Sequence, residues 1–198
     1  MKVTTEMIKE LRARTGAGVL DVKRALEDSG GDIDIATQAL REKGLAVVDR
    51  VAGREAREGL VEAYIHGRGR LGALVEINCE TDFVARTEEF RALAHDVAMQ
   101  VTATDPRYLS SEDIPLEKLE ERRDALRAEV AGENGSQEKI DELIEGGLEE
   151  FIREVCLLNQ PFIKDEGLTV QDHVNRAMAQ FGENLVVRRF ARFELGEG

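Results

Sequence analysis

The sequence predicts an α+β protein in which an N-terminal bundle of three short helices precedes a core of a three-stranded antiparallel sheet packed with helices. Three observations support this fold class. Apolar residues recur with a helical period before residue 45, the period changes to two on both sides of a glycine-rich turn at 67–70, and a long helical period follows from Phe90. With 198 residues, of which 42% are hydrophobic, the chain is long enough to bury a core.

Start and stop signals bound each of the three N-terminal helices. Thr4 or Thr5 caps the first helix, which a Thr-Gly-Ala-Gly segment then interrupts. The second helix is expected over residues 19–28, because a Ser-Gly-Gly segment follows it. Asp32 caps the third helix, which is expected to end at Gly44.

These signals divide the chain into three parts. Residues 1–47 are expected to form a small partner-binding domain, since a unit of this size is near the lower limit for an independent fold and is too small for an ordinary catalytic domain. Residues 48–58 have mixed charges and little apolar periodicity, so they are expected to be a linker, with a solvated helix as the alternative. Residues 59–198 form the predicted core domain.

A hairpin followed by a helix opens the core domain. Segments 60–66 and 71–79 flank Gly-Arg-Gly-Arg, which is a hairpin signal. The helix that follows is expected to end at Asp105 and Pro106. Its apolar stripe is the strongest in the chain and consists of Phe90, Leu93, Ala94, Val97, Ala98 and Val101.

The rest of the core is predicted to hold two charged helices, a third helix and a strand. The charged helices are expected over 116–130 and 140–158, around a turn at 132–136. Thr169 and Asp172 open the next helix. The last strand is expected over 185–195, with one face made by Leu185, Val187, Ala191, Phe193 and Leu195.

The charge distribution favours a protein partner over a nucleic acid. The net charge is −13, and segment 112–166 has 7 basic and 17 acidic residues, a net −10. Affinity for phosphate backbones rests on Lys and Arg, so direct nucleic-acid binding is not expected. No apolar run is long enough for a membrane span and the N-terminus leads into no apolar segment, so we expect a cytoplasmic protein.

The residues offer little for catalysis or metal binding. Cys79 and Cys156 are expected to be buried and structural, and Glu80 beside Cys79 would raise a thiol pKa. The three histidines have no metal-ligand spacing. A carboxylate pair of Glu80 and Asp82 for acid–base chemistry is the weakest alternative. We therefore expect no enzyme activity, no cofactor and no bound metal.

The chain is organised around the point where the second strand meets the following helix. Thr81, Asp82 and Phe83 occupy this corner. Two interpretations stay open from the residues alone. In one, Thr81 or Asp82 is the helix N-cap and Phe83 folds back onto the core as a staple. In the other, Phe83 is an exposed probe directed at a partner.

Three segments resemble the elongation factor Ts family. They are residues 11–26, LRARTGAGVLDVKRAL, residues 76–86, EINCETDFVAR, and residues 182–190, GENLVVRRF. The second segment is the most specific. Because the segments occur in order along the whole chain, the resemblance covers essentially all of it.

The resemblance implies a guanine-nucleotide exchange factor of the GTPase elongation factor Tu. Its N-terminal bundle would be similar to ubiquitin-associated domains and would rest on the GTPase through Arg12, Val19 and Leu20. The corner would intrude near the Mg²⁺ site of the GTPase, with Phe83 wedged between two helices, so that Mg²⁺ leaves and GDP loosens. The corner residues implied in this displacement are Thr81, Asp82, Phe83 and Val84.

The sequence resembles the short form of the family, because it carries no internal repeat of the core. Short-form members pair as homodimers, so a homodimer through the core is expected, with an unpaired edge at the last strand. The alternative function is an adaptor whose helical bundle binds another protein without exchange activity.

Overall fold

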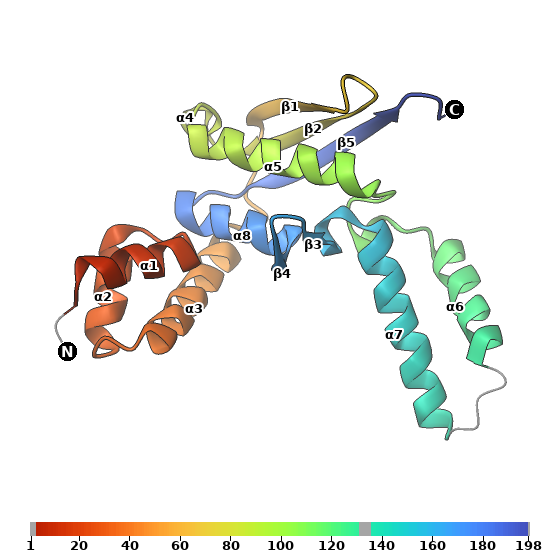
Figure 1. Ribbon diagram of the computed structural model, residues 1–198, viewed down its shortest axis with the longest axis horizontal. Helices are drawn as coiled ribbons and strands as arrows, with labels where there is room; N and C mark the ends of the chain where they lie inside the picture. Colours follow the sequence, from red (N-terminus) through yellow and green to blue (C-terminus); the bar gives the residue numbers. More distant parts are fainter. Residues whose placement is uncertain (1–2, 131–135, 198) are drawn as a thin grey trace.

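The computed structural model describes residues 3–130 and 136–197 and confirms the α+β fold class (Figure 1). A three-helix bundle lies at one end, a sheet covered by helices lies in the middle, and a helical pair projects away from the sheet. The segment 131–135, which contains most of the predicted turn at 132–136, lies outside the described residues.

The N-terminal bundle consists of α1 (Thr5–Thr15), α2 (Val19–Asp28) and α3 (Ile33–Val51). The hydroxyl of Thr4 accepts a hydrogen bond from the amide of Met7, and the carboxylate of Asp32 accepts from two amides of α3. Gly16 ends α1 at φ 69°, a conformation that favours glycine. The bundle encloses its own apolar cluster, made of Leu11, Val22, Leu26, Ala36 and Leu40.

The predicted end of the third helix at Gly44 is wrong, because α3 continues to Val51. Gly44 faces α8, where an added Cβ would lie 3.5 Å from Cβ of Ala179, so this glycine sits at a close helix crossing instead of a helix end. Val51 is fully buried in the cluster of the core. Apolar contacts made by the last turns of α3 therefore extend the helix past Gly44. In this way α3 connects the apolar cluster of the bundle to that of the core.

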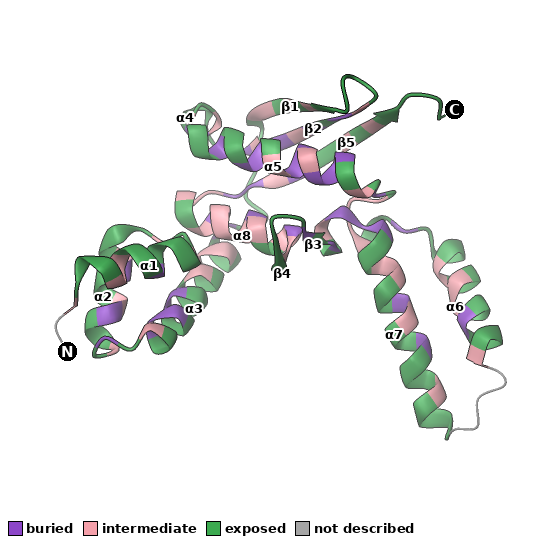
Figure 2. Ribbon diagram, viewed as in Figure 1, coloured by how far each residue is buried: buried purple, intermediate pink, exposed green. Residues whose placement is uncertain are grey.

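The sheet contains β1 (Glu58–His66), β2 (Leu71–Cys79) and β5 (Val186–Glu194) in the order β1-β2-β5, with both pairs antiparallel. The predicted hairpin is confirmed. Gly67 and Gly69 in its turn have φ of 59° and 84°. One face of β2 is buried under helix α5 (Glu88–Thr104), whose whole predicted apolar stripe is buried. Figure 2 shows buried residues concentrated where α5, α8 and the sheet meet.

The predicted face of the last strand is only partly right. The pairing register of β2 and β5 shifts between Glu76 and Ile77, which leaves Arg188 as an extra residue on β5. A one-residue shift exchanges the two faces of a strand. Val187 is therefore buried, whereas Ala191, Phe193 and Leu195, which were predicted on the same face as Val187, are exposed. Phe190 and Arg192 turn inward instead.

The projecting pair consists of α6 (Leu116–Val130) and α7 (Gln137–Val155), so the second helix starts and ends earlier than predicted. The two helices share a small apolar cluster around Leu126, Ile144 and Leu148. A Cβ added at Gly147 would lie 2.5 Å from Cδ2 of Leu126, so glycine lets the helices approach closely at this point. A short hairpin of β3 (Pro161–Phe162) and β4 (Asp165–Thr169), which sequence reasoning missed, leads into α8 (Val170–Phe181).

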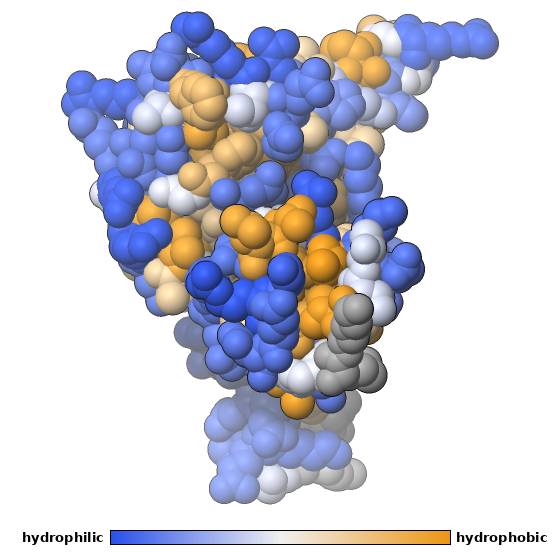
Figure 3. Space-filling view, turned by 90° about the vertical axis from the view of Figure 1, so that its left-hand side faces the viewer, coloured by the Kyte–Doolittle hydropathy of each residue, from blue (hydrophilic) through white to orange (hydrophobic). Residues whose placement is uncertain are grey.

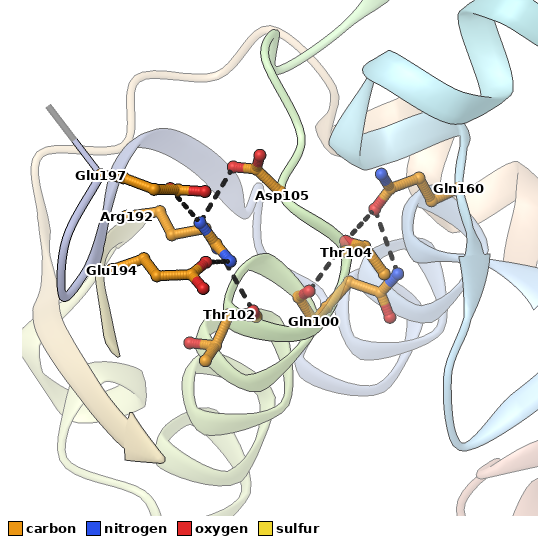
Figure 4. Close-up of polar contacts among 8 residues, drawn as sticks. All are labelled: Gln100, Thr102, Thr104, Asp105, Gln160, Arg192, Glu194 and Glu197. Atoms are coloured by element: carbon orange, nitrogen blue, oxygen red, sulfur yellow. Dashed lines mark hydrogen bonds and ion pairs between the residues drawn. The ribbon is translucent and has the colours of Figure 1, made fainter. Parts of the chain in front are cut away.

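Two buried glutamines join α5 to the segment after α7 (Figure 4). The amide nitrogen of Gln100 donates to Oε1 of Gln160 and to the carbonyl of Pro161, each over 3.1 Å. Its Oε1 accepts from the amide of Ile163 over 2.9 Å, and the Thr104 hydroxyl donates to Oε1 of Gln160 over 2.7 Å. Because these buried polar groups are paired, the network fixes the base of the projecting pair against α5.

The same figure shows how β5 is tied to the end of α5. The guanidinium of Arg192 donates to the carbonyl of Thr102 over 3.3 Å and lies 3.5 Å from Asp105. It also pairs with Glu194 and Glu197. This turned-in arginine, a consequence of the register shift, anchors the end of the last strand.

Candidate functional site

We refer to residues 81–84 as the corner. It follows β2 and consists of the N-cap and the first three residues of the single-turn helix α4 (Asp82–Ala85). Thr81 has extended backbone angles, and its Oγ1 accepts a hydrogen bond from the amide of Val84 over 3.4 Å, which makes Thr81 the N-cap. The side chain of Val84 is buried in the core. The cap and this buried anchor together fix the direction of the corner.

Phe83 is 78% exposed, so it does not pack back onto the core. The staple interpretation is therefore wrong for Phe83, whereas its assignment of Thr81 as a helix N-cap is confirmed. The probe interpretation stays a prediction. Asp82 is not the cap either. Its carboxylate is exposed and lies 2.7 Å from the guanidinium of Arg86, one turn later in the chain. The corner thus presents an aromatic ring and a carboxylate to the solvent from a firmly held backbone.

A carboxylate that is distant from the corner along the chain holds the corner from behind. Oε2 of Glu183, which lies between α8 and β5, accepts hydrogen bonds from the amides of Glu80 and Thr81, each over 3.1 Å. Its Oε1 accepts from the Thr81 hydroxyl over 2.7 Å. Sequence reasoning missed this contact. The only available signal was the polar Gly-Glu-Asn segment just before the last strand.

Glu80 supports the same region and does not form an acid–base pair with Asp82. Its Oε1 accepts from the amide of Asn184 over 2.6 Å and lies 3.7 Å from the guanidinium of Arg54. The side-chain amide of Asn184 donates to the carbonyl of Arg54 over 2.6 Å. The chain that enters β1 is therefore tied to the back of the corner.

Cys79, next to the corner, is a buried structural thiol, as predicted. Burial, assisted by the negative charge of Glu183, raises the pKa of Cys79 to about 11. Its S–H donates to the carbonyl of Thr81 over 3.1 Å. A thiol with so high a pKa is a poor nucleophile near neutral pH. Sequence reasoning named Glu80 as the cause of the raised pKa, whereas burial is the first cause.

The described residues contain no group of three or more His, Cys, Asp or Glu side chains that could hold a metal ion. The histidines have separate partners. His66 contacts Tyr64, His95 lies 3.3 Å from Glu62, and His173 pairs with Asp96. Among the described residues, neither cysteine is hydrogen-bonded to one of these histidines.

The three predicted binding residues of the bundle lie near its α1–α2 connection. Val19 and Leu20 start α2 and are 50% and 82% exposed. Arg12, in the last turn of α1, is also exposed. Figure 3, which faces the end of the molecule where the bundle and α4 lie, shows apolar side chains over the bundle and further ones above it at the level of α4. One face therefore carries exposed apolar groups from both regions.

The exposed aromatic on the fixed corner and the exposed apolar start of α2 make a candidate protein-binding site in an α+β protein. Comparison with known proteins identifies the family of this chain. The sequence model described as "Elongation factor TS" matches residues 23–197. Elongation factor Ts of Carboxydothermus hydrogenoformans is 55% identical over 99% of this chain and 90% of its own length. That of Caldanaerobacter subterraneus is 54% identical over 99% of this chain and 98% of its own length.

The chain belongs to the elongation factor Ts family, and this membership supports a role in translation elongation. The resemblance of three short segments to this family is thereby confirmed over nearly the whole chain. Within the described residues, no helix is both long and apolar enough to cross a membrane.

Proposed function

We propose that this protein promotes the release of GDP from elongation factor Tu by inserting the corner near the Mg²⁺ site of that GTPase. The observation that carries the proposal is the 78% exposure of Phe83 on a capped and anchored turn. An aromatic side chain contributes little to stability when it is exposed to water. At the centre of a protein–protein interface, by contrast, such a side chain often contributes much of the binding energy. Phe83 would enter between two helices of the GTPase.

The corner residues have different parts in this mechanism. Thr81 caps α4 and Val84 anchors it, so these two residues hold the backbone. Asp82 brings a negative charge toward the neighbourhood of Mg²⁺, and Phe83 displaces the helices that help to hold the ion. No covalent bond forms or breaks. If the factor binds the nucleotide-free GTPase more tightly than the GDP-bound form, linkage requires that GDP be weakened by the same ratio.

The bundle supplies a second contact with the same partner. Leu20 is 82% exposed at the start of α2, and Val19 and Arg12 are exposed close to it in the chain. These residues would rest on the nucleotide-binding domain while the corner acts beside it. Because α3 also packs against α8, the bundle is held at a set position relative to the core.

We retain the division into a partner-binding domain of residues 1–47, a linker of 48–58 and a core domain of 59–198 as a proposal. The continuation of α3 supports the helical alternative for the first part of the linker, since residues 48–51 are its last turn. The chain has regular strand structure again from Glu58. Removal of the bundle is expected to weaken binding to the GTPase more than it changes the sheet.

We further propose a homodimer formed through the outer face of the sheet. One face of the sheet packs on α5, but the other exposes a group of large apolar side chains, which are Val61, Ile65, Leu74 and Phe193. Contiguous apolar surface of this kind is typical of an interface. A second copy placed by a two-fold axis would bury the same face of both protomers.

The decisive experiment measures the release of fluorescent GDP from purified elongation factor Tu. The protein is expected to accelerate release at catalytic concentration and to leave the rate of GTP hydrolysis unchanged. Binding without any acceleration of release would contradict exchange and support the adaptor alternative.

The acidic surface and the requirement for a translation partner also lead us to propose a cytoplasmic protein that binds no nucleic acid directly.

A further inference from the structure

One carboxylate accepts three hydrogen bonds at the back of the corner. Glu183 accepts from the amides of Glu80 and Thr81 and from the hydroxyl of Thr81. About 100 residues separate it from the corner in the chain. It touches the two residues that immediately precede Asp82, so a shift of this carboxylate would turn the segment that carries Phe83.

The contact is reciprocal, which makes it more rigid than a single acceptor would be. Glu80 reaches in the opposite direction and accepts from the amide of Asn184, the neighbour of Glu183. Each of two adjacent chain segments thus offers a carboxylate to the backbone amides of the other. Hydrogen bonds to ionised acceptors are among the strongest in proteins, and two opposed sets restrict sliding as well as separation.

The same pair of segments also holds the chain that comes from the bundle. Asn184 donates to the carbonyl of Arg54, and Glu80 lies 3.7 Å from the guanidinium of that residue. Arg54 follows α3 closely, so it marks the exit of the chain from the bundle. One group of polar contacts therefore connects the two regions that the proposed function directs at the GTPase.

We propose that Glu183 is a positioning residue for nucleotide exchange, which holds the corner at the angle from which Phe83 enters the partner. This inference rests on the proposed function. It gives Glu183 no contact with the GTPase or with nucleotide. Loss of the carboxylate lowers the maximal rate at which bound factor releases GDP, while the contact of the bundle with the GTPase, and hence the concentration needed for half-saturation, changes little.

Three variants of the full-length protein test this role by GDP release at increasing factor concentration. Glu183→Ala removes all three hydrogen bonds and is expected to lower the maximal release rate about ten-fold, with a change in half-saturation below about two-fold. Glu183→Gln is expected to restore most of the rate, because its amide oxygen accepts from both backbone amides and its amide group donates to the Thr81 hydroxyl. Glu150→Ala, an exposed carboxylate on α7, is the matched control and should behave as wild type.

Circular dichroism at the assay temperature separates positioning from general destabilisation. The rates are divided by the folded fraction, and amide hydrogen exchange at Glu80 and Thr81 reports the loss of the contact directly. The proposal is overturned if folded Glu183→Ala keeps the wild-type maximal rate, or if Glu183→Gln is as slow as Glu183→Ala. A wild-type protein that releases no GDP contradicts the proposed function and the positioning role with it, whereas equal release by wild type and Glu183→Ala contradicts the positioning role alone.

Discussion

Nε2 of His173 lies 3.2 Å from Oδ2 of Asp96, which ties α8 to α5. The other oxygen of Asp96 accepts from Nζ of Lys164 over 2.6 Å. Phe162 stacks on the imidazole ring with a centroid distance of 4.3 Å. Burial raises the pKa of Asp96, but the hydrogen bonds from His173 and Lys164 outweigh it and hold the pKa below its ordinary value.

This arrangement predicts a component of acid unfolding. Since the pKa of Asp96 is lower in the folded than in the unfolded chain, its contribution to stability is complete above the unfolded value of about 3.9 and is lost as the pH falls toward the folded value. Asp96→Asn is expected to lower the free energy of unfolding at pH 7 by about 1.5–3 kcal/mol. It should also flatten the dependence of stability on pH below about pH 4. Urea unfolding from pH 7 to pH 3 measures both effects, and an unchanged slope would refute the assignment.

Phe83→Ala should separate binding from folding. Because the ring is 78% exposed, we expect the melting temperature to stay within about 2 °C of wild type. Loss of an interface aromatic should lower the efficiency of GDP release about ten- to a hundred-fold. The matched control is Phe90→Ala, which removes a fully buried ring and should destabilise the fold by about 3–5 kcal/mol. A Phe83→Ala protein that melts early yet exchanges normally per folded molecule would exclude the wedge mechanism.

Asp82→Ala tests the exposed carboxylate of the corner. The cap belongs to Thr81, so Asp82 contributes to stability only through an exposed ion pair with Arg86 and its place in the first turn of α4. We expect a stability loss below about 1 kcal/mol and slower GDP release. Thr81→Ala, by comparison, removes the cap and should cost about 1 kcal/mol or more. Thermal melting and release measured on both variants check this, and equal destabilisation would show that Asp82 shares the capping role.

Leu74→Glu should convert the proposed dimer into monomers. Leu74 lies in the central strand on the outer face of the sheet and is exposed in the single chain, so a charge there costs little in the monomer and much in a closed interface. Sedimentation at micromolar concentration should give twice the 22.0 kDa chain mass for wild type and the chain mass for the variant. Leu116→Glu, an exposed leucine on α6, is the control and should remain dimeric. A wild-type protein that sediments only as a monomer would contradict the dimer.

Local signals were enough for most elements of this fold. The stripe from Phe90 to Val101 was predicted correctly because a helical period depends only on spacing along the chain, and all of its members are buried. Thr4, Asp32 and Thr169 start helices because their side chains satisfy amides within three residues. The glycine-rich turn at 67–70 likewise specifies its hairpin locally.

The wrong predictions concern features that depend on contacts between residues far apart in the chain. Gly44 carries the signal of a helix end, but the packing of α3 on α8 continues the helix to Val51. Alternation placed Phe193 on the same face as Val187, but the register shift between Glu76 and Ile77, which is a property of the paired strands, placed the two on opposite faces.

The sequence by itself determined the family, the α+β fold class and the position of Thr81, Asp82 and Phe83 at a strand-to-helix corner, because short motifs and periods are encoded by neighbours in the chain. Only the tertiary structure decided that Phe83 points into solvent, that Thr81 is the cap, and that Glu183 holds the corner from behind. The physical reason is that side-chain exposure and long-range hydrogen bonds depend on which segments meet in space, and the chain separation of Glu183 from Thr81 leaves no local pattern from which their contact could be predicted.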